Sequence, residues 1–239
     1  MVDLKDFVPV IYQGRVFKNK VINDKGEVYN KKTNKFLNIR ERKDEDVYLC
    51  PKRKLRSGKN RVRHEVSLGN GHITLSRLIA ESFSSRVKKS PLVRAFDLKL
   101  GDDVVVTTET GKEVRLIVST DHIDGDHTNN ILDNIRWATQ VEQNANRVCL
   151  NQLGYKGVRK RGNKFFAYFG LGRTQEDLRI KIRSKSRVRL EEAALDYNDL
   201  IIEGFSIAFG EKIAREIHDE VAYLNVVKKK QLMLDLVYH

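Results

Sequence analysis

The first third of the chain alternates apolar and polar residues over short segments separated by turn residues. Four stretches between residues 16 and 75 have strand length and pattern: KVINDKGEVYN, KFLNIR, VYLCPKRK and RHEVSLGNGHITL, the last with a hairpin at residues 69–71. The next stretch, LSRLIAESF, spaces apolar residues as a helix does and offers Ser76 as a cap. We therefore expect a β-rich module over residues 1–85 that ends in one helix.

A second hairpin is expected over residues 86–118, as an insertion before the next module. DDVVVTT and KEVRLIVST flank ETGK, whose Gly111 suits a tight turn. The second strand runs directly into Asp121 and His122. A helix should begin after Thr139, because Thr139 and Glu142 have the spacing of a capping box. Residues 119–150 thus predict strand, polar loop and helix, around a small core of Ile123, Ile131, Leu132, Ile135 and Trp137.

The last third of the chain predicts three strands and then helix. GYKGVRKRGNKFFAYFGL and LRIKIRSK supply the strands, and RVRLEEAALDYNDLIIEGF has helical periodicity. These segments form one module over residues 151–210. The remaining residues, 211–239, predict a helical tail with Ile213, Ile217, Val221 and Leu224 on one face. The pattern as a whole indicates an α+β protein of several small modules.

The charge of the chain points to a polyanionic partner. Forty-five Lys and Arg against 32 Asp and Glu give a net charge of +13. Such an excess is typical of proteins that bind nucleic acid, although solvated cations alone would give the same number. No apolar run is long enough to cross a bilayer, so we expect a protein of the cytoplasm or nucleoid. Cys50 and Cys149 form no CxxC pair, which argues against a structural zinc site.

The stretch DHIDGDHTNNILDNIRWATQVEQNANR, residues 121–147, has the residue types of a hydrolytic site. Phosphodiester hydrolysis needs an activated water and a counter-charge for the phosphate. An imidazole such as His122 is suited to accept the water's proton near neutral pH. A carboxylate such as Asp121 is the kind of ligand that Mg²⁺ prefers, together with carbonyl and phosphate oxygens. The alternative to a hydrolytic site is that these residues only form a polar turn before a helix.

This stretch resembles the HNH nucleases of phage and homing-endonuclease type, which have a ββα-metal fold. The resemblance covers DHIDGD, NN, DNIRWAT and the helix that follows. It implies that His122 is the general base, that Asp121 binds one divalent cation, Mg²⁺ or Mn²⁺, and that Asn134 orients the loop of the histidine. It implies no organic cofactor.

The second metal ligand is where this chain departs from the family. Members of this type have Asn four residues after the conserved Thr, and this chain has Gln143 there, with Asn144 next to it. Gln143 offers the same carbonyl oxygen one methylene further out. Asn144 lies about 100° further around the helix. We expect Gln143 to be the ligand. The polar residues Asp124, Gly125, Asp126, Asn129 and Asn130 are expected to form the turn, and His127 to be solvated or near a phosphate.

Two further resemblances lie on either side of this stretch. Residues 1–85 are similar to the NUMOD-type module of many phage nucleases. Residues 151–210 resemble the APETALA-type, or ethylene-response-factor, DNA-binding domain, whose three-stranded sheet enters the major groove. That resemblance implies DNA contacts by Lys156, Arg159, Arg161, Lys164 and Tyr168. The basic run CPKRKLRSGKNRVRH adds Arg53 and Arg56 as candidates for phosphate contact, or as part of a solvated loop.

Together these features predict a site-preferring, metal-dependent DNA endonuclease that acts on double-stranded DNA. A monomer with one such centre would nick one strand and leave 5′-phosphate and 3′-hydroxyl ends. The competing hypothesis is a DNA-binding regulator of nuclease descent, in which Gln143 has cost the protein its metal. RNA binding is a third hypothesis, and it lacks the aromatic platform that single-stranded RNA modules use.

Overall fold

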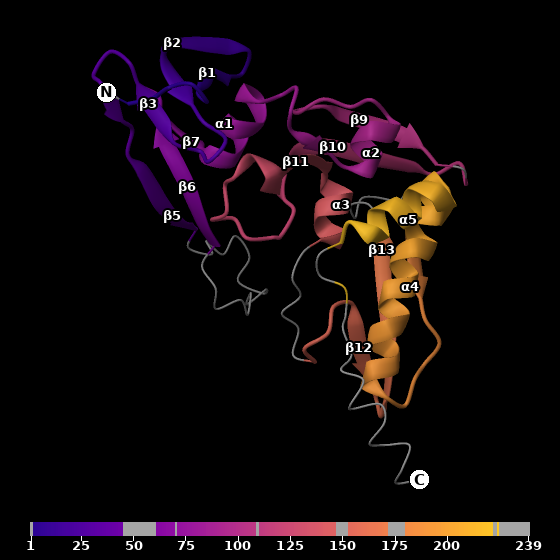
Figure 1. Cartoon of the computed structure of the whole chain (residues 1–239). Coiled ribbons are helices and arrows are strands. Elements are labelled where there is room, and N and C mark those ends of the chain that lie inside the picture. The colour runs from indigo at the N-terminus through magenta and orange to yellow at the C-terminus, as the bar shows by residue number, and fades with distance from the viewer. Residues whose placement is uncertain are drawn as a thin grey trace. The chain divides into compact units, whose positions relative to one another are not determined.

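A computed structural model describes residues 2–44, 61–69, 71–108, 110–146, 153–171, 180–221 and 224. Arg53, Arg56, Cys50 and Cys149 lie outside these ranges. The chain forms two compact units: Met1–Asp102 with Val118–Thr139, and Asp103–Ile117 with Gln140–His239. Each unit combines antiparallel strands with helices (Figure 1), so the expected α+β class is confirmed.

The N-terminal part of the first unit contains two small antiparallel sheets. The first sheet has the order β1-β2-β3-β4 and comprises β1 (Val8–Tyr12), β2 (Arg15–Ile22), β3 (Val28–Asn30) and β4 (Lys35–Phe36). The second has the order β5-β6-β7 and comprises β5 (Ile39–Asp44), β6 (Arg61–Ser67) and β7 (His72–Thr74). β1 was not expected from the sequence.

Helix α1 (Leu75–Ser82) follows β7 and buries one apolar face. Leu78 and Ile79 are fully buried on this face, as the spacing predicts. The expected cap is wrong: Ser76 lies inside the helix and is buried, and Thr74 occupies the N-cap position without a side-chain hydrogen bond. The helix therefore depends on apolar burial and not on a cap for its start.

The polar stretch lies on a four-stranded sheet with the order β8-β11-β10-β9. Its strands are β8 (Lys88–Lys89), β9 (Asp103–Thr107), β10 (Glu113–His122) and β11 (Ile135–Thr139). The first half of β10 pairs with β9, which is the expected hairpin, and the second half pairs with β11. The boundary expected between residues 118 and 119 therefore falls inside one strand. β8, which runs parallel to β11, and helix α2 (Pro91–Ala95) were not expected.

A polar loop connects β10 to β11 and ends in a 3-10 turn, η1 (Leu132–Asn134). Helix α3 (Gln140–Ala145) begins directly after β11, at the position that the sequence predicts. Three of the five expected core residues, Leu132, Ile135 and Trp137, are buried. Ile123 is half-buried, and Ile131, the extended residue directly before η1, is 45% exposed. Ile131 is therefore wrong as a core residue.

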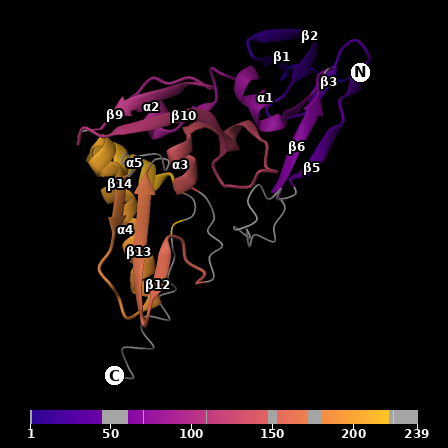
Figure 2. The same ribbon diagram turned by 180° about the vertical axis from the view of Figure 1, so that it is seen from behind.

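The second unit contains the three strands and long helix expected near the C-terminus. β12 (Val158–Arg161), β13 (Lys164–Leu171) and β14 (Ile180–Arg183) form an antiparallel sheet with β13 in the centre. Helix α4 (Leu190–Phe209) covers one face of this sheet, and α5 (Glu211–Asp219) packs against α4 (Figure 2). A Cβ at Gly204 would lie 2.5 Å from the Phe169 ring, so the glycine allows the helix to approach the sheet closely.

Among the described residues, no helix is both long enough and apolar enough to span a membrane.

Candidate functional site

His122 is the last residue of β10 and lies beside Asp121 at the edge of the polar loop. In the register of β10 and β11, His122 is opposite Ile135 and Asp121 is opposite Arg136. The His122 side chain is buried. A strand end fixes the backbone of both residues, so their side chains are held by a rigid element at the start of the loop.

The Asp121 carboxylate forms an ion pair with Arg136 across the two strands. Oδ2 of Asp121 lies 3.0 Å from Nε and 2.9 Å from Nη2 of Arg136, and both side chains are largely buried. Oδ1 of Asp121 makes no contact of this kind with any described residue. One carboxylate oxygen is thus held by the arginine, and the other remains available to a cation.

Asn134 holds the loop that follows His122. Its Oδ1 accepts from the backbone N–H of Asp124 at 3.1 Å, and its Nδ2 donates to Asp124 Oδ1 at 2.9 Å and to the Asn129 carbonyl at 2.8 Å. Its own carbonyl accepts from the N–H of Ile123. Both ends of the amide and the backbone therefore fix the loop next to His122. The role of Asn134 in orienting a general base stays a prediction.

The loop carboxylates serve the turn, as the sequence predicts. Asp124 Oδ1 accepts from the N–H of Asp126, and Asp126 Oδ1 accepts from the N–H and the hydroxyl of Thr128. The hydrogen bonds from Thr128 are the main reason why the pKa of Asp126 lies below its ordinary value. These are the local side-chain contacts of Asx turns.

Burial by itself would raise the pKa of Asp124. Hydrogen bonds from Asn129, from the backbone N–H of Asp126 and from Asn134 outweigh burial, and the nearby His122 adds a smaller attraction. The pKa of Asp124 therefore lies below its ordinary value, and the residue is a carboxylate at neutral pH. The loop beside His122 carries fixed negative charge that favours a cation there.

The hydrogen bonds of Asn130 identify which nitrogen of His122 carries the proton. Nδ2 of Asn130 faces the carbonyl oxygens of Thr128 at 3.1 Å and His127 at 3.4 Å, so this end of the amide must be the donor. Asn130 Oδ1 then accepts from Nε2 of His122 at 3.1 Å. Neutral His122 is therefore protonated on Nε2, and Nδ1 is the nitrogen able to accept a proton.

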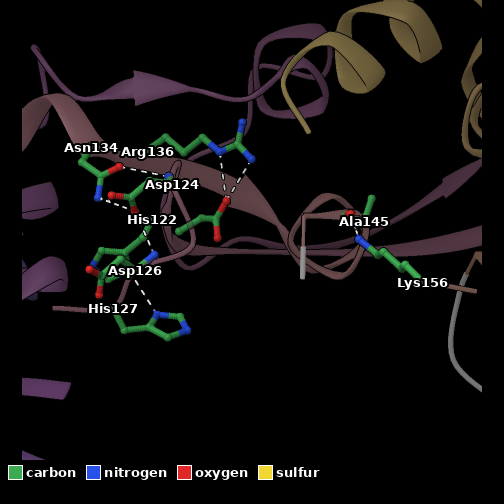
Figure 3. A network of polar contacts seen from close by, with 9 residues as sticks. His122, Asp124, Asp126, His127, Asn134, Arg136, Ala145 and Lys156 are labelled. Atoms are coloured by element: carbon green, nitrogen blue, oxygen red, sulfur yellow. Dashed lines mark hydrogen bonds and ion pairs between the residues drawn. The ribbon is translucent and has the colours of Figure 1, made fainter. Parts of the chain in front are cut away.

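His127 covers that accepting nitrogen. The two imidazole rings meet edge to face with centroids 5.1 Å apart, and their Nδ1 atoms are 3.3 Å apart (Figure 3). His127 is exposed, whereas His122 is buried beneath it. A reactant that approaches Nδ1 of His122 must therefore meet or displace His127, so His127 belongs to the candidate site and is more than a solvated loop residue.

The helix candidates for a metal ligand differ in exposure. Gln143 is half-buried and Asn144 is exposed on α3. Among the described residues, no three His, Cys, Asp or Glu side chains gather as a metal cluster. A hard cation in this protein would thus be held by few protein oxygens and would complete its shell with phosphate and water, as Mg²⁺ often does. Asp121 Oδ1 is an oxygen of the kind that such binding uses.

The sheet of the second unit presents a basic face opposite α4. Side chains on this face alternate with the apolar ones that α4 covers: Arg159, Arg161, Lys164, Phe166, Tyr168, Lys181 and Arg183. Arg159 lies 4.5 Å over the Tyr168 ring, and Arg183 lies 4.0 Å over the Phe166 ring. Four of the five DNA contacts expected within residues 151–210 lie on this face. Phe166 was not singled out by the sequence, because aromatic residues in a strand usually indicate core.

The fifth expected contact, Lys156, is elsewhere. Its side chain is buried, and its ammonium donates to the carbonyl of Ala145 near the C-terminal end of α3 (Figure 3). A buried lysine that satisfies a helix carbonyl is a structural element. This placement argues against a DNA contact by Lys156. Arg187, which follows β14, is likewise held by a protein partner, because it makes two hydrogen bonds to Asp196 of α4.

Comparison with family models, curated proteins and solved structures gives no significant match to this chain.

Proposed function

We propose that this protein is a metal-dependent DNA endonuclease of the HNH type. The observation that carries the proposal is the state of His122 at the end of a rigid strand: Nε2 donates to Asn130, so Nδ1 is the accepting nitrogen, and it faces Nδ1 of His127 at 3.3 Å. The succession of β10, polar loop, β11 and α3 is the order of elements expected of a ββα nuclease motif. Asn134 supports the same reading, because it fixes the loop beside the base.

In the proposed reaction, His122 takes a proton from water at Nδ1 as the water oxygen attacks the phosphorus. The bond from phosphorus to the 3′ oxygen breaks, so the products carry a 5′-phosphate and a 3′-hydroxyl. A divalent cation, Mg²⁺ or Mn²⁺, held by Asp121 and Gln143 would stabilise the charge on the phosphate and on the leaving oxygen. Arg136 holds Asp121 in place and limits how much negative charge the carboxylate offers to the cation.

The basic sheet supports double-stranded DNA as the substrate. A β-ribbon fits the major groove, and Arg159, Arg161 and Arg183 have the fork of donors that reads guanine or grips phosphate. Such cations hold the duplex, and the site at His122 cuts it. One centre per chain predicts a monomer that nicks one strand.

The experiment is cleavage of supercoiled plasmid by the full chain in Mg²⁺, with and without a chelator, and end-group analysis of the nicked product. Nicks with 5′-phosphate ends that vanish with the chelator support the proposal. Intact plasmid, or nicking that persists with the chelator, refutes it.

The ion pair of Asp121 favours a second candidate, a DNA-binding regulator without nuclease activity. A carboxylate neutralised by Arg136, in a chain that has Gln143 where the family has Asn, makes a weak cation site. Two variants distinguish the nuclease from the regulator. If Gln143→Asn nicks plasmid in Mg²⁺ and the parent does not, the protein is the regulator. If the parent nicks and His122→Ala does not, it is the nuclease.

A further inference from the structure

We propose that His64 and Asn130 are positioning residues for His122, and that the N-terminal sheets thereby form part of the reaction site. The expected effect of these residues on DNA cleavage rests on the proposed function. Their expected effect on the ring of His122 rests on geometry alone. His64 lies on β6 and Asn130 in the polar loop, 66 positions further along the chain, within the same compact unit.

The hydrogen bonds along this pair run in one direction. Asn130 Nδ2 is a donor, because two carbonyl oxygens face it, and it lies 3.1 Å from Nδ1 of His64. Nδ1 of His64 therefore accepts, and His64 carries its own proton on Nε2, with Glu41 Oε1 3.9 Å away. At the other end of the amide, Oδ1 of Asn130 accepts from Nε2 of His122. Donation therefore runs from His122 through Asn130 to His64, and it leaves Nδ1 of His122, which faces His127, as the accepting nitrogen.

The backbone around Asn130 is supported by the same N-terminal module. The N–H of Leu132 donates to the carbonyl of Asp24 at 2.8 Å. Gly26, with φ of +83°, lies so close that a Cβ there would be 3.2 Å from the carbonyl oxygen of Asn130. The turn before β3 and strand β6 thus contact the loop at neighbouring positions. A module expected only to contact DNA also sets the position of the loop that holds His122.

Burial explains why this pair matters for the orientation of His122. His122, Asn130 and Asn134 are all less than a tenth exposed. The side chain of His64 is 23% exposed, so water reaches only one end of the chain of hydrogen bonds. A buried amide that loses one partner finds no water to replace it, and its alternative orientations become populated. The partners of a functional histidine commonly fix its ring state and orientation in this way.

The test is ¹⁵N NMR of histidine-labelled full-length protein at about pH 8.5, above the ordinary histidine titration range. Signals of His122 are assigned as those missing from His122→Gln. We expect wild type to be protonated on Nε2. Asn130→Leu, of similar volume, should raise the fraction protonated on Nδ1 at least about fivefold, the value of one hydrogen bond. His64→Leu should act in the same direction, and His64→Asn, which keeps an acceptor where Nδ1 lies, should restore the wild-type state.

Kinetics on plasmid DNA supply the second readout. His64→Leu and Asn130→Leu should lower kcat by about tenfold or more with little change in KM, and His64→Asn should recover most of the loss. The matched control is His72→Leu, an exposed histidine on the neighbouring strand β7, which should leave both readouts at their wild-type values. Thermal unfolding of each variant separates loss of fold from loss of orientation.

The proposal is overturned if folded His64→Leu and Asn130→Leu keep the ring state of wild-type His122. It is also overturned if His64→Asn fails to recover what His64→Leu loses. If wild type does not cut DNA, the proposed function fails, and the NMR comparison still decides whether His64 and Asn130 set the state of His122.

Discussion

Arg136 holds the Asp121 carboxylate from the adjacent strand, with two of its nitrogens on one oxygen. Both side chains are largely buried, so the pair is part of the interior of the sheet as well as of the site. Removal of the arginine would leave a carboxylate with no opposite charge, and removal of the carboxylate would leave a buried guanidinium.

Arg136→Leu should therefore lower the free energy of unfolding by about 3 kcal/mol, the loss expected when one member of a buried ion pair is removed. Denaturant unfolding at neutral pH measures this loss. Arg115→Leu is the matched control, because Arg115 pairs with Asp103 on the β9–β10 hairpin but is more than half exposed. It should cost much less than Arg136→Leu, because solvent screens an exposed ion pair. Equal losses in the two variants would show that burial of the Asp121 pair contributes nothing.

Asn134→Ala should loosen the loop between β10 and β11. The variant removes hydrogen bonds to both ends of the loop and leaves the N–H of Asp124 and the carbonyl of Asn129 without this partner. A loss of about 2 kcal/mol in the free energy of unfolding is expected, together with faster hydrogen exchange of the Asp124 amide. Asn144→Ala, at an exposed position of α3, should change stability by less than about 0.5 kcal/mol. Unchanged exchange at Asp124 would contradict the role of Asn134.

The ion pair between Arg187 and Asp196 should give the second unit a pH-dependent stability. Hydrogen bonds from Arg187 hold the pKa of Asp196 below its ordinary value of 3.8. The unfolded chain then binds the proton more readily, so the stabilisation is complete above about pH 5 and is lost as the pH falls through the lowered pKa. As the pH is lowered from 5, the free energy of unfolding should fall less steeply for Asp196→Asn and for Arg187→Leu than for wild type. Identical slopes would contradict this assignment.

Arg159→Ala and Arg183→Ala should each weaken binding to duplex DNA by about five- to tenfold, because both cations lie on the exposed face of the sheet. The slope of log affinity against log salt should decrease by about one for each cation that contacts a phosphate. Fluorescence anisotropy over a salt series measures both quantities. Arg215→Ala is the control, since Arg215 lies on α5 and pairs with Glu211. Equal affinity loss in Arg215→Ala would contradict a DNA-binding role of the sheet face.

Lys156→Ala should destabilise the protein without a specific loss of affinity for DNA, because the Lys156 side chain is buried.

The sequence predicted the elements whose apolar spacing is regular. Helix α4 buries residues at the helical period, and β9 and β10 alternate around the turn at Gly111, so both could be read from the pattern. Helix α3 begins where Thr139 and Glu142 indicate. These features depend on neighbours within a few residues, which local sequence contains.

Strand β11 could not be read in this way, because every one of its residues is buried and one of them is Arg136. A charge in a continuous buried strand interrupts the apolar run, and its ion pair with Asp121 on the neighbouring strand is not visible in the local sequence. β8 has two residues and no pattern at all. The contact between His64 and Asn130 joins two modules through side chains far apart in sequence, and neither segment contains a local signal for it.

The most direct test of the account is the rate of DNA nicking by His122→Ala relative to wild type, at saturating enzyme and Mg²⁺ in a single turnover. Loss of the general base should slow the reaction by about 100-fold or more while DNA affinity stays within about twofold of wild type. If wild type nicks and His122→Ala nicks at the same rate, His122 is not the base, and the site built around it does not cut DNA.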